Sequence, residues 1–530
     1  MTTFRRCLST VCLWLCSLLI GCILATPAWC ASVNVPLDHW SYRAIDTLIG
    51  FGLIRTAMVG TKPFTRAEIA RLIVEASQRV GGLRPHQAVV AQDLLQRLHD
   101  AFRDEVRFYD GQAVTVPTTL VKPLDELAVQ YVHLDGVPTR MLPVDAIDAT
   151  EGTPLVRNNE GINYRDGENF LLTTTTYGKL WNWFSFFVQP LFTLKGDLDD
   201  ELDATARLHK GYAKGQLGPV ELEVGRDAVR WGQGERGTLV FSNHAPPLDF
   251  IKVSTPQPVL LPGILQHLGL FKAETFLTQL EGDRDDSKSK IWGWRLLVKP
   301  TSWFEIGVLE ATQFDGEGVP GLRGQDILKI LTFRRVGGEN EQNRVNQLLA
   351  LDWRIILPFL RSTQVYAEIG FEDRGDIGVL AGLYVPRLTD DGRTAFRFEW
   401  MRNTIHIDRV PGVWYTHSTF TSGFTFEDMV LGHANGGESQ EFFWRLTRNL
   451  TAHAMLGFDA AYRWRRGRLL VGSTTQESHY EGGLDLQYFF TAAWEVGARL
   501  AVEKVQNFNL QPDVDRENTL LWLQVKYHFL

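Results

Sequence analysis

Cysteine is nearly absent from this 530-residue chain, and its distribution is uneven. The five cysteines all precede residue 31: Cys7, Cys12, Cys16, Cys22 and Cys30. Two arginines and an apolar run in the same segment form the pattern of a secretory signal over residues 1–30. Cleavage after Ala28 would leave one cysteine and cleavage after Cys30 none, so the mature chain can form no internal disulfide. A lipoprotein box with lipidation at Cys22 is the alternative.

Several other features are missing, and each absence excludes a class of protein. No apolar run after residue 30 is long enough for a membrane helix. The thirteen histidines include no pair at helical spacing with a suitable acid, so no metal site is predicted. No glycine-rich phosphate loop follows a buried strand, and we expect no cofactor. The net charge of −8 argues against a nucleic-acid partner.

The N-terminal part of the mature chain, residues 31–106, has helical periodicity. Asp38 is placed to cap a first helix, and Thr65, followed by a glutamate three residues later, a second. A third helix is predicted between residues 85 and 106. We expect these helices to form a small periplasmic domain, followed by a proline-containing linker over residues 107–125.

The first two predicted helices, DHWSYRAIDTLIGFGLI and FTRAEIARLIVEA, resemble a single copy of the S-layer homology module. The resemblance implies cell-wall glycan as a partner, because proteins with this module are held to that glycan. The alternative is that the two helices are a packing unit with cap residues in the same places. Both interpretations remain open from the sequence.

From residue 126 onward, apolar residues recur at every second position. Residues 450–464 keep this alternation for about fifteen residues, whereas strands in soluble domains have about five or six and transmembrane strands about nine to eleven. One face of these segments is apolar and the other is charged, as in a membrane barrel with a polar lumen. The sequence therefore predicts an all-β transmembrane barrel of about 18 antiparallel strands over residues 126–530.

The chain ends on such a strand, LWLQVKYHFL. Its apolar face carries Leu521, Leu523, Val525, Tyr527 and Phe529. An outer-membrane barrel must pair its last strand with its first, because an unpaired strand edge cannot be satisfied in lipid. We expect this strand to close the barrel, although Leu530 stands where the insertion signal of such barrels usually has an aromatic residue.

The most distinctive segment is VGRDAVRWGQGERGTLVFSNHAPPLDF, residues 224–250. Together with LPGILQHLGL and WFEIGVLEATQFDGEGVPG, it resembles the capsule-assembly outer-membrane proteins of the Wzi type. The resemblance covers most of residues 120–530. It implies an eighteen-stranded outer-membrane barrel, closed or plugged by periplasmic helices, that acts as a lectin for capsular polysaccharide. We assign structural roles to eight motif residues: Gly225, Asp227, Gly232, Gly234, Asn243, Pro246, Pro247 and Asp249.

Six residues are candidates for contact with polysaccharide: Arg226, Arg230, Trp231, Arg409, Trp414 and Tyr415. Guanidinium groups pair with the carboxylates of an acidic glycan, and indole rings stack on sugars. The first three lie on the polar face of the barrel, where ion pairs that hold an inward-folded loop are the alternative. The last three lie in a predicted extracellular loop, residues 408–419, where a membrane girdle is the alternative. Residues 283–290 and 313–325 are further candidate loops.

The function predicted from these patterns is to bind and retain capsular or extracellular polysaccharide at the surface of a Gram-negative bacterium. Many weak contacts along one polymer would hold it. Expected partners are this polysaccharide, outer-membrane lipid, the barrel-assembly machinery and, through the N-terminal helices, cell-wall glycan. We predict no enzymatic activity, because acidic pairs such as Asp285 with Asp286 lie in turns where solvated charge explains them. A porin or polysaccharide-export channel is one alternative, and a surface glycan hydrolase with two catalytic carboxylates is another.

Overall fold

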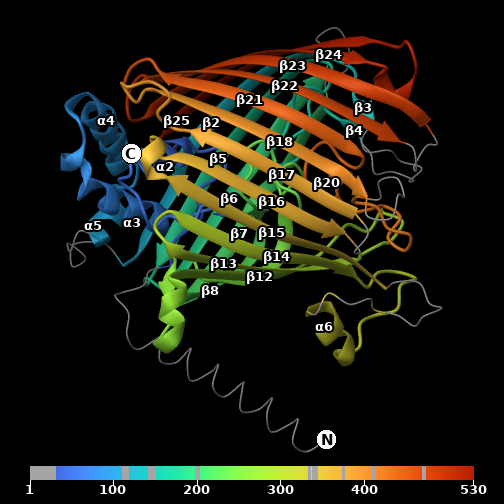
Figure 1. Ribbon diagram of the computed structural model, residues 1–530, viewed down its shortest axis with the longest axis horizontal. Coiled ribbons are helices and arrows are strands. Elements are labelled where there is room, and N and C mark those ends of the chain that lie inside the picture. Colours follow the sequence, from blue (N-terminus) through green and yellow to red (C-terminus); the bar gives the residue numbers. More distant parts are fainter. Residues whose placement is uncertain are drawn as a thin grey trace, which may run out of the picture.

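Eighteen antiparallel strands close into a barrel, and helices lie at one of its ends (Figure 1). The computed structural model describes residues 31–109, 118–140, 151–196, 203–331, 333, 336, 344–372, 376–406, 414–467 and 473–529. The predicted fold, an all-β barrel of about eighteen strands with a helical N-terminal region, is confirmed. The secretory signal predicted for residues 1–30 lies outside the described residues.

The wall strands follow one another along the chain. They are β2 (Leu120–Asp135), β5 (Gly167–Leu180), β6 (Phe184–Gly196), β7 (Asp203–Leu217), β8 (Val220–Asp227), β10 (Leu248–Ser254), β12 (Leu270–Gln279), β13 (Lys290–Thr301), β14 (Phe304–Phe314), β15 (Val345–Leu357), β16 (Thr363–Glu372), β17 (Asp376–Val385), β18 (Thr394–His406), β21 (Ser439–Asn449), β22 (Ala454–Gly467), β23 (Ser473–Phe489), β24 (Trp494–Gln506) and β25 (Arg516–His528). A short strand, β11 (Val259–Leu260), pairs with β12 beside β10.

Three two-stranded pairs lie apart from the wall: β1 (Thr61–Lys62) with β9 (Arg230–Trp231), β3 (Thr139–Arg140) with β4 (Glu151–Gly152), and β19 (Thr425–Phe426) with β20 (Met429–Val430). The helices are α2 (Ser41–Gly50), α3 (Arg66–Ser77), α4 (Pro85–Ala101), α5 (Arg103–Tyr109) and α6 (Gly324–Leu331), with the 3-10 segments η1 (Val80–Gly82), η3 (Gly263–Leu268), η4 (Pro358–Leu360) and η5 (Phe508–Leu510). No described helix is long and apolar enough to cross a membrane.

Alternation along each strand decides which residues face outward. In β10, Ile251 is 56% exposed on the outer face, whereas Lys252 next to it is buried on the lumen side. The same pattern continues around the wall and gives an apolar exterior and a charged lumen. A contiguous apolar surface of this size is unfavourable against water and matches the lipid-facing band of an outer-membrane barrel.

The final strand closes the barrel, as its pattern predicted. β25 pairs with β24 on one side and with β2 on the other, with Tyr527 opposite Leu127 and Val525 opposite Val129. The apolar face of β25 points outward. No strand edge of the wall is left unpaired at this seam, which satisfies the backbone where water is absent. Leu530 lies outside the described residues.

The two ends of the barrel differ in their connections. At the end where the helices and the C-terminus lie, strands are joined by short turns such as residues 181–183 and 302–303. At the other end, long connections such as residues 228–247 join the strands. We call these the helix end and the loop end (Figure 1).

The N-terminal helices are packed onto the helix end. Their apolar faces form one core that includes Phe489 and Ile356 of the barrel. Gly50 at the end of α2 lies so close to Pro386 that a Cβ would come within 2.3 Å of that side chain. Helices and barrel therefore share a buried interface, which makes the helical region a cover for this end of the barrel.

Helix boundaries partly match the predictions. Thr65 caps α3 as predicted, because its hydroxyl accepts a hydrogen bond from the Glu68 N–H at 3.1 Å. Asp38 does not cap α2; instead its carboxylate accepts a 2.6 Å bond from Lys526 in the final strand.

The third predicted helix is divided into α4 and α5. Helix α5 continues to Tyr109 and β2 begins at Leu120, so the connection is shorter than the predicted linker of residues 107–125.

The closing strand generates a testable prediction. Replacing both Tyr527 and Phe529 with Ser should prevent insertion into the outer membrane, because it removes the aromatic contacts of the final strand, including the 4.7 Å ring pair of Tyr527 with Trp494. Heat-modifiable migration of the protein in outer-membrane fractions measures this. Deletion of Leu530 is the control and should leave insertion intact; normal insertion of the double variant would contradict the role assigned to this strand.

Candidate functional site

Three chain segments fold into the lumen and are bonded to one another. They are residues 56–64 between α2 and α3, residues 228–247 between β8 and β10, and residues 414–438 before β21. Strand β1 of the first pairs with β9 of the second. The second is joined to the third by a 2.8 Å bond from the Ser242 N–H to the Leu431 carbonyl. We call these three segments together the plug.

Glutamates on the lumen face of the wall hold the backbone of the plug. Glu368 of β16 accepts hydrogen bonds from three backbone N–H groups, those of Gln233 at 2.6 Å, Gly234 at 2.9 Å and Leu239 at 3.0 Å. Glu399 of β18 accepts from two more. These bonds supply acceptors that an irregular buried backbone would otherwise lack.

Wall glutamates hold the first and third segments of the plug in the same way. Glu305 of β14 accepts from the N–H groups of Val59 at 3.3 Å and Gly60 at 2.9 Å. Glu372 of β16 accepts from the N–H of Tyr415. Strand alternation points these glutamates into the lumen, so the periodicity that builds the wall also supplies the acceptors for the plug.

Close backbone contacts in the wall and in the plug explain the motif glycines. Gly225 and Gly232 both have a φ of 134°, a conformation that residues with a Cβ rarely adopt. A Cβ on Gly232 would also lie 2.4 Å from a carboxylate oxygen of Glu368. A Cβ on Gly234 would lie 2.1 Å from the Gly237 carbonyl oxygen. Glycine is required here because the backbone itself carries the contact with the wall.

Other motif residues also have structural contacts. Asp227 accepts a 2.7 Å hydrogen bond from the Asn34 side chain, which ties the N-terminal segment to the wall. Asn243 donates to the Asn158 carbonyl at 2.8 Å. Pro246 packs directly on residue 161. These contacts tie the motif to neighbouring segments of the chain.

The aromatic candidates for sugar contact are buried in the plug. Trp231, Trp414 and Tyr415 are fully buried and belong to one apolar cluster. Trp231 donates to Glu274 at 2.9 Å, and the Tyr415 hydroxyl donates to the Leu239 carbonyl at 2.6 Å. A ring without exposed area cannot stack on a sugar, which corrects our expectation that Trp414 and Tyr415 form an exposed lectin surface.

Of the arginine candidates, Arg230 holds an inward-folded loop, as the alternative interpretation described, whereas Arg226 has surroundings that were not predicted. Arg230 is buried and donates to backbone carbonyls of its own loop. Arg226 lies on the outer face of β8 rather than in the lumen, and pairs with Asp249 of β10 through two bonds of 2.9 and 2.6 Å. Arg226 faces outward because strand alternation points its neighbour Asp227 into the lumen. Arg409 lies outside the described residues.

Two candidate loops dock at the outer part of the third plug segment. Arg284 donates to the carbonyls of Gly423 and Thr425 at 2.8 and 2.9 Å, which docks residues 283–290 on residues 416–428. Lys288 pairs with Glu317 at 3.1 Å and adds residues 314–323. We call these three ranges the loop-end surface. The sequence indicated residues 283–290 and 313–325, but the carbonyls that Arg284 contacts lie beyond the predicted loop 408–419, and only the structure shows that the three ranges form one surface.

Polar groups dominate the exposed part of the loop-end surface. They include Asp285, Lys288, Glu317, Ser418 and Thr421. Asp285 accepts a 3.0 Å bond from the Thr421 hydroxyl across the junction of two loops. Burial lowers the pKa of His417 to about 4, so its ring is neutral at physiological pH. Hydroxyl, carboxylate and ammonium groups of this kind can bond sugar hydroxyls.

The comparisons with known proteins decide the family. The model of the family described as capsule assembly protein Wzi matches residues 140–520, which is most of the chain. The chain belongs to the Wzi capsule-assembly family. No curated protein matches it.

Several solved structures resemble this Wzi-family chain, and one of them supports the fold. This one is Wzi of Escherichia coli, an outer-membrane protein involved in group 1 capsule assembly and described as a carbohydrate-binding β-barrel. It is 16% identical, with 94% of this chain and 99% of that chain covered and a TM-score of 0.66. Another is OpdQ of Pseudomonas aeruginosa, 11% identical over 78% of this chain and 97% of that chain, with a TM-score of 0.44.

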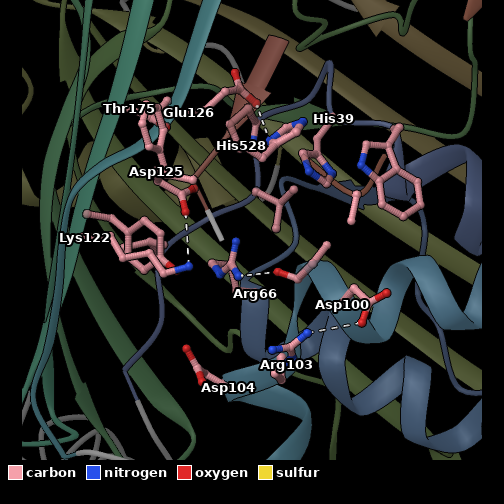
Figure 2. Close-up of a pocket in the computed structure, with 18 of the residues that line it drawn as sticks. His39, Arg66, Asp100, Arg103, Asp104, Lys122, Asp125, Glu126, Thr175 and His528 are labelled. Carbon is pink, nitrogen blue, oxygen red and sulfur yellow. Dashed lines mark hydrogen bonds and ion pairs between the residues drawn. The ribbon is translucent and has the colours of Figure 1, made fainter. Parts of the chain in front are cut away.

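A second candidate site of this Wzi-family barrel lies at the helix end (Figure 2). A cavity of about 390 Å³ separates α4 and α5 from the barrel wall. Its lining carries charges of both signs, among them Lys122 with Asp125 and Arg103 with Asp100. Arg97 lines it as well and stacks on Trp40 and Phe489. Among the described residues, no group of His, Cys, Asp and Glu could hold a metal ion.

Arg66, in the segment that resembles the S-layer homology module, lines this cavity but is already bonded. It donates to Glu105 at 2.6 Å and to the Ala101 carbonyl at 2.8 Å. Although burial raises it, the Arg66 guanidinium lowers the pKa of the Glu105 carboxyl below its usual value, so the pair is ionic at neutral pH. These contacts give the segment a packing role within the helical cover.

The plug contacts predict that Gly232→Ala loosens the lumen. The new methyl group would collide with Glu368 and strain the backbone, and should release the three N–H groups that Glu368 holds. Each buried N–H left without an acceptor costs about 1–3 kcal/mol. Planar-bilayer recordings should show ion current through the variant and none through the parent protein.

Gly215→Ala is the matched control, because nothing lies within 4 Å of a Cβ at that position of β7. It should leave the lumen closed and the thermal unfolding temperature close to that of the parent. Equal behaviour of the two alanine variants would contradict the role given to the contact with Glu368.

Proposed function

We propose that this protein binds capsular or extracellular polysaccharide at the loop-end surface and retains it at the cell surface without catalysis. Membership of the capsule-assembly family supports the biological setting. The observation that carries the proposal is the arrangement of the barrel itself. Bonded chain segments fill the lumen, and a continuous polar surface covers the end where the long loops meet.

The proposed orientation places the helix end in the periplasm and the loop end outside the cell. Outer-membrane barrels have short periplasmic turns and longer extracellular loops, and the two ends of this barrel differ in that way. The predicted secretory signal would export the chain from the cytoplasm. The barrel-assembly machinery is then expected to contact the final strand. The helical cover would then face the cell wall.

The plug supports binding over conduction. A porin or export channel needs a continuous aqueous path, whereas here β1 pairs with β9 inside the lumen and glutamates from β14, β16 and β18 hold the surrounding backbone. Opening such a path would require several buried hydrogen bonds to break together. The polymer is therefore proposed to bind outside the barrel and not to pass through it.

The loop-end surface suits a repeating polymer better than a single tight ligand. Its exposed groups are hydroxyls, carboxylates and ammonium groups spread over three loops, each able to make a weak bond to a sugar. Once one sugar unit is bound, the next units of the same polymer are held near the surface at a high effective concentration. Arg409, from a neighbouring part of the sequence, remains a proposed contact with acidic sugars.

The helix-end cavity supports a second proposed contact, with cell-wall glycan. Charged side chains of both signs line the cavity, among them Arg103, Asp104 and Lys122, and such groups can bond sugar hydroxyls. Binding there would tie the barrel to the cell wall on the inner side while polysaccharide is retained on the outer side. Fragments of cell-wall glycan added to the refolded protein test this contact by saturation-transfer NMR.

The binding proposal predicts the behaviour of a loop-end variant with Asp285→Ala, Glu317→Ala and Thr421→Ala. Loss of these groups should weaken pull-down of capsular polysaccharide by at least tenfold, because about 1.4 kcal/mol of binding free energy is a factor of ten and one net hydrogen bond to a charged group is worth about that much. Cells with this variant should shed capsule into the medium.

Asp390→Ala at the helix end is the matched control, because its carboxylate is also highly exposed. It should bind and retain polysaccharide like the parent. Full capsule binding by the loop-end variant would contradict the proposed surface. Ion current through the parent protein would favour the channel, and release of new reducing ends from the polysaccharide would favour the hydrolase.

A further inference from the structure

A short helical segment at the helix end presents apolar side chains away from the barrel. Segment η3, with the residues just before it, exposes Leu260 at 63% and Ile264 at 82%, and Leu265 and Leu268 are exposed as well. No residue of η3 is buried. Such a segment is unfavourable in water and calls for an apolar or interfacial environment.

A second apolar segment lies at the loop end. Helix α6 buries Ile330 against Val336 and Val345, which fixes one of its faces on the barrel. Its remaining apolar residues point elsewhere, with Leu328 exposed at 63% and Ile327 and Leu331 about half exposed. The helix is thus apolar on its exposed face as well as on its packed face.

The positions of the two segments in the chain set their heights on the barrel. Segment η3 immediately precedes β12, and α6 follows β14. Strands β12, β13 and β14 have 10, 12 and 11 residues, and about 9–11 residues are enough for a tilted strand to cross the hydrocarbon layer. Segments at opposite ends of these strands therefore lie near the two membrane interfaces.

Both segments also lie outside the barrel, along the same part of its wall. In Figure 1, α6 and the green coil that leads into β12 project below the barrel at its two ends. Between them run the outward side chains of the wall, such as Leu277 and Leu296, which are exposed. At the helix end, Trp303 and Phe359 in the neighbouring turns continue the exposed apolar surface beside η3.

We propose that η3 and α6 are interfacial anchors, one in each leaflet of the membrane. Each inserts its exposed apolar side chains into the boundary between lipid headgroups and acyl chains. Lipid is the occupant that this placement favours, because each segment borders the lipid-facing band and extends it outward in the plane of the membrane. The anchors would fix the height and tilt of the barrel at β12–β14. The proposal rests on the membrane placement of the barrel and not on polysaccharide binding.

Single-cysteine labelling tests the proposal on the full mature chain. In a Cys30→Ser background, Ile264→Cys and Leu328→Cys are each labelled with an environment-sensitive fluorophore and reconstituted into phosphatidylcholine vesicles. Emission should shift to shorter wavelength at both positions. Lipids that carry a nitroxide near the headgroup should quench it more strongly than lipids with the nitroxide deep in the acyl chain. Gln511→Cys, exposed at the loop end, is the control and should emit as in water.

Other outcomes would overturn the proposal. Emission at the wavelength of a water-exposed label, without quenching by either lipid, would mean that the segments lie in solvent. A shift that grows with the ratio of protein to lipid, without quenching by the nitroxides, would assign the surface to a second copy of the chain. Heat-modifiable migration verifies the fold of each variant, and Leu265→Cys and Leu331→Cys replace any that misfold.

Discussion

The structure depends on hydrogen bonds from buried backbone N–H groups to carboxylates on the lumen wall. When a chain segment folds into a barrel, its backbone groups lose the water molecules that would accept and donate their hydrogen bonds. Irregular segments also lack the regular bonds of a β-sheet that would replace them. Glu305, Glu368 and Glu399 supply the acceptors. The glycines of the motif, the burial of the aromatic residues and the docking of the N-terminal segment all follow from this need for close approach.

The filled lumen determines where function can lie. Because the N-terminal region contributes β1 to the plug and its helices to the cover, closure uses residues far apart in the sequence. Recognition of a polymer is therefore proposed for the loop-end surface, where docking between loops gives a fixed arrangement of exposed polar groups. Retention of the polymer, rather than its passage through the barrel, is the function we propose.

Local patterns were enough to predict the wall. Period-two alternation gave the barrel, its approximate strand number and the closing role of β25, and the Thr65 signal gave the start of α3. Long-range contacts were beyond such patterns. Asp38 has the right type and position for a cap, yet its partner is Lys526, almost five hundred residues away.

The candidate site was harder to predict for the same reason. Arginine and tryptophan near glycines indicate either a sugar site or a buried network, and only the fold shows that Trp231 and Trp414 pack inside the plug. The loops 283–290 and 313–325 were indicated by their composition, but their junction depends on Arg284 and Lys288 finding partners in other loops.

The central claim is that wall carboxylates hold the plug closed, and amide hydrogen exchange of the reconstituted protein tests it most directly. The amides of Gln233, Gly234 and Leu239 should exchange slowly, at a rate similar to those of the wall strands β15 and β16. Exchange as fast as that of the exposed residues Gly318 and Gly321 would contradict the account, because it would mean that the segment is not bonded to the wall in the membrane.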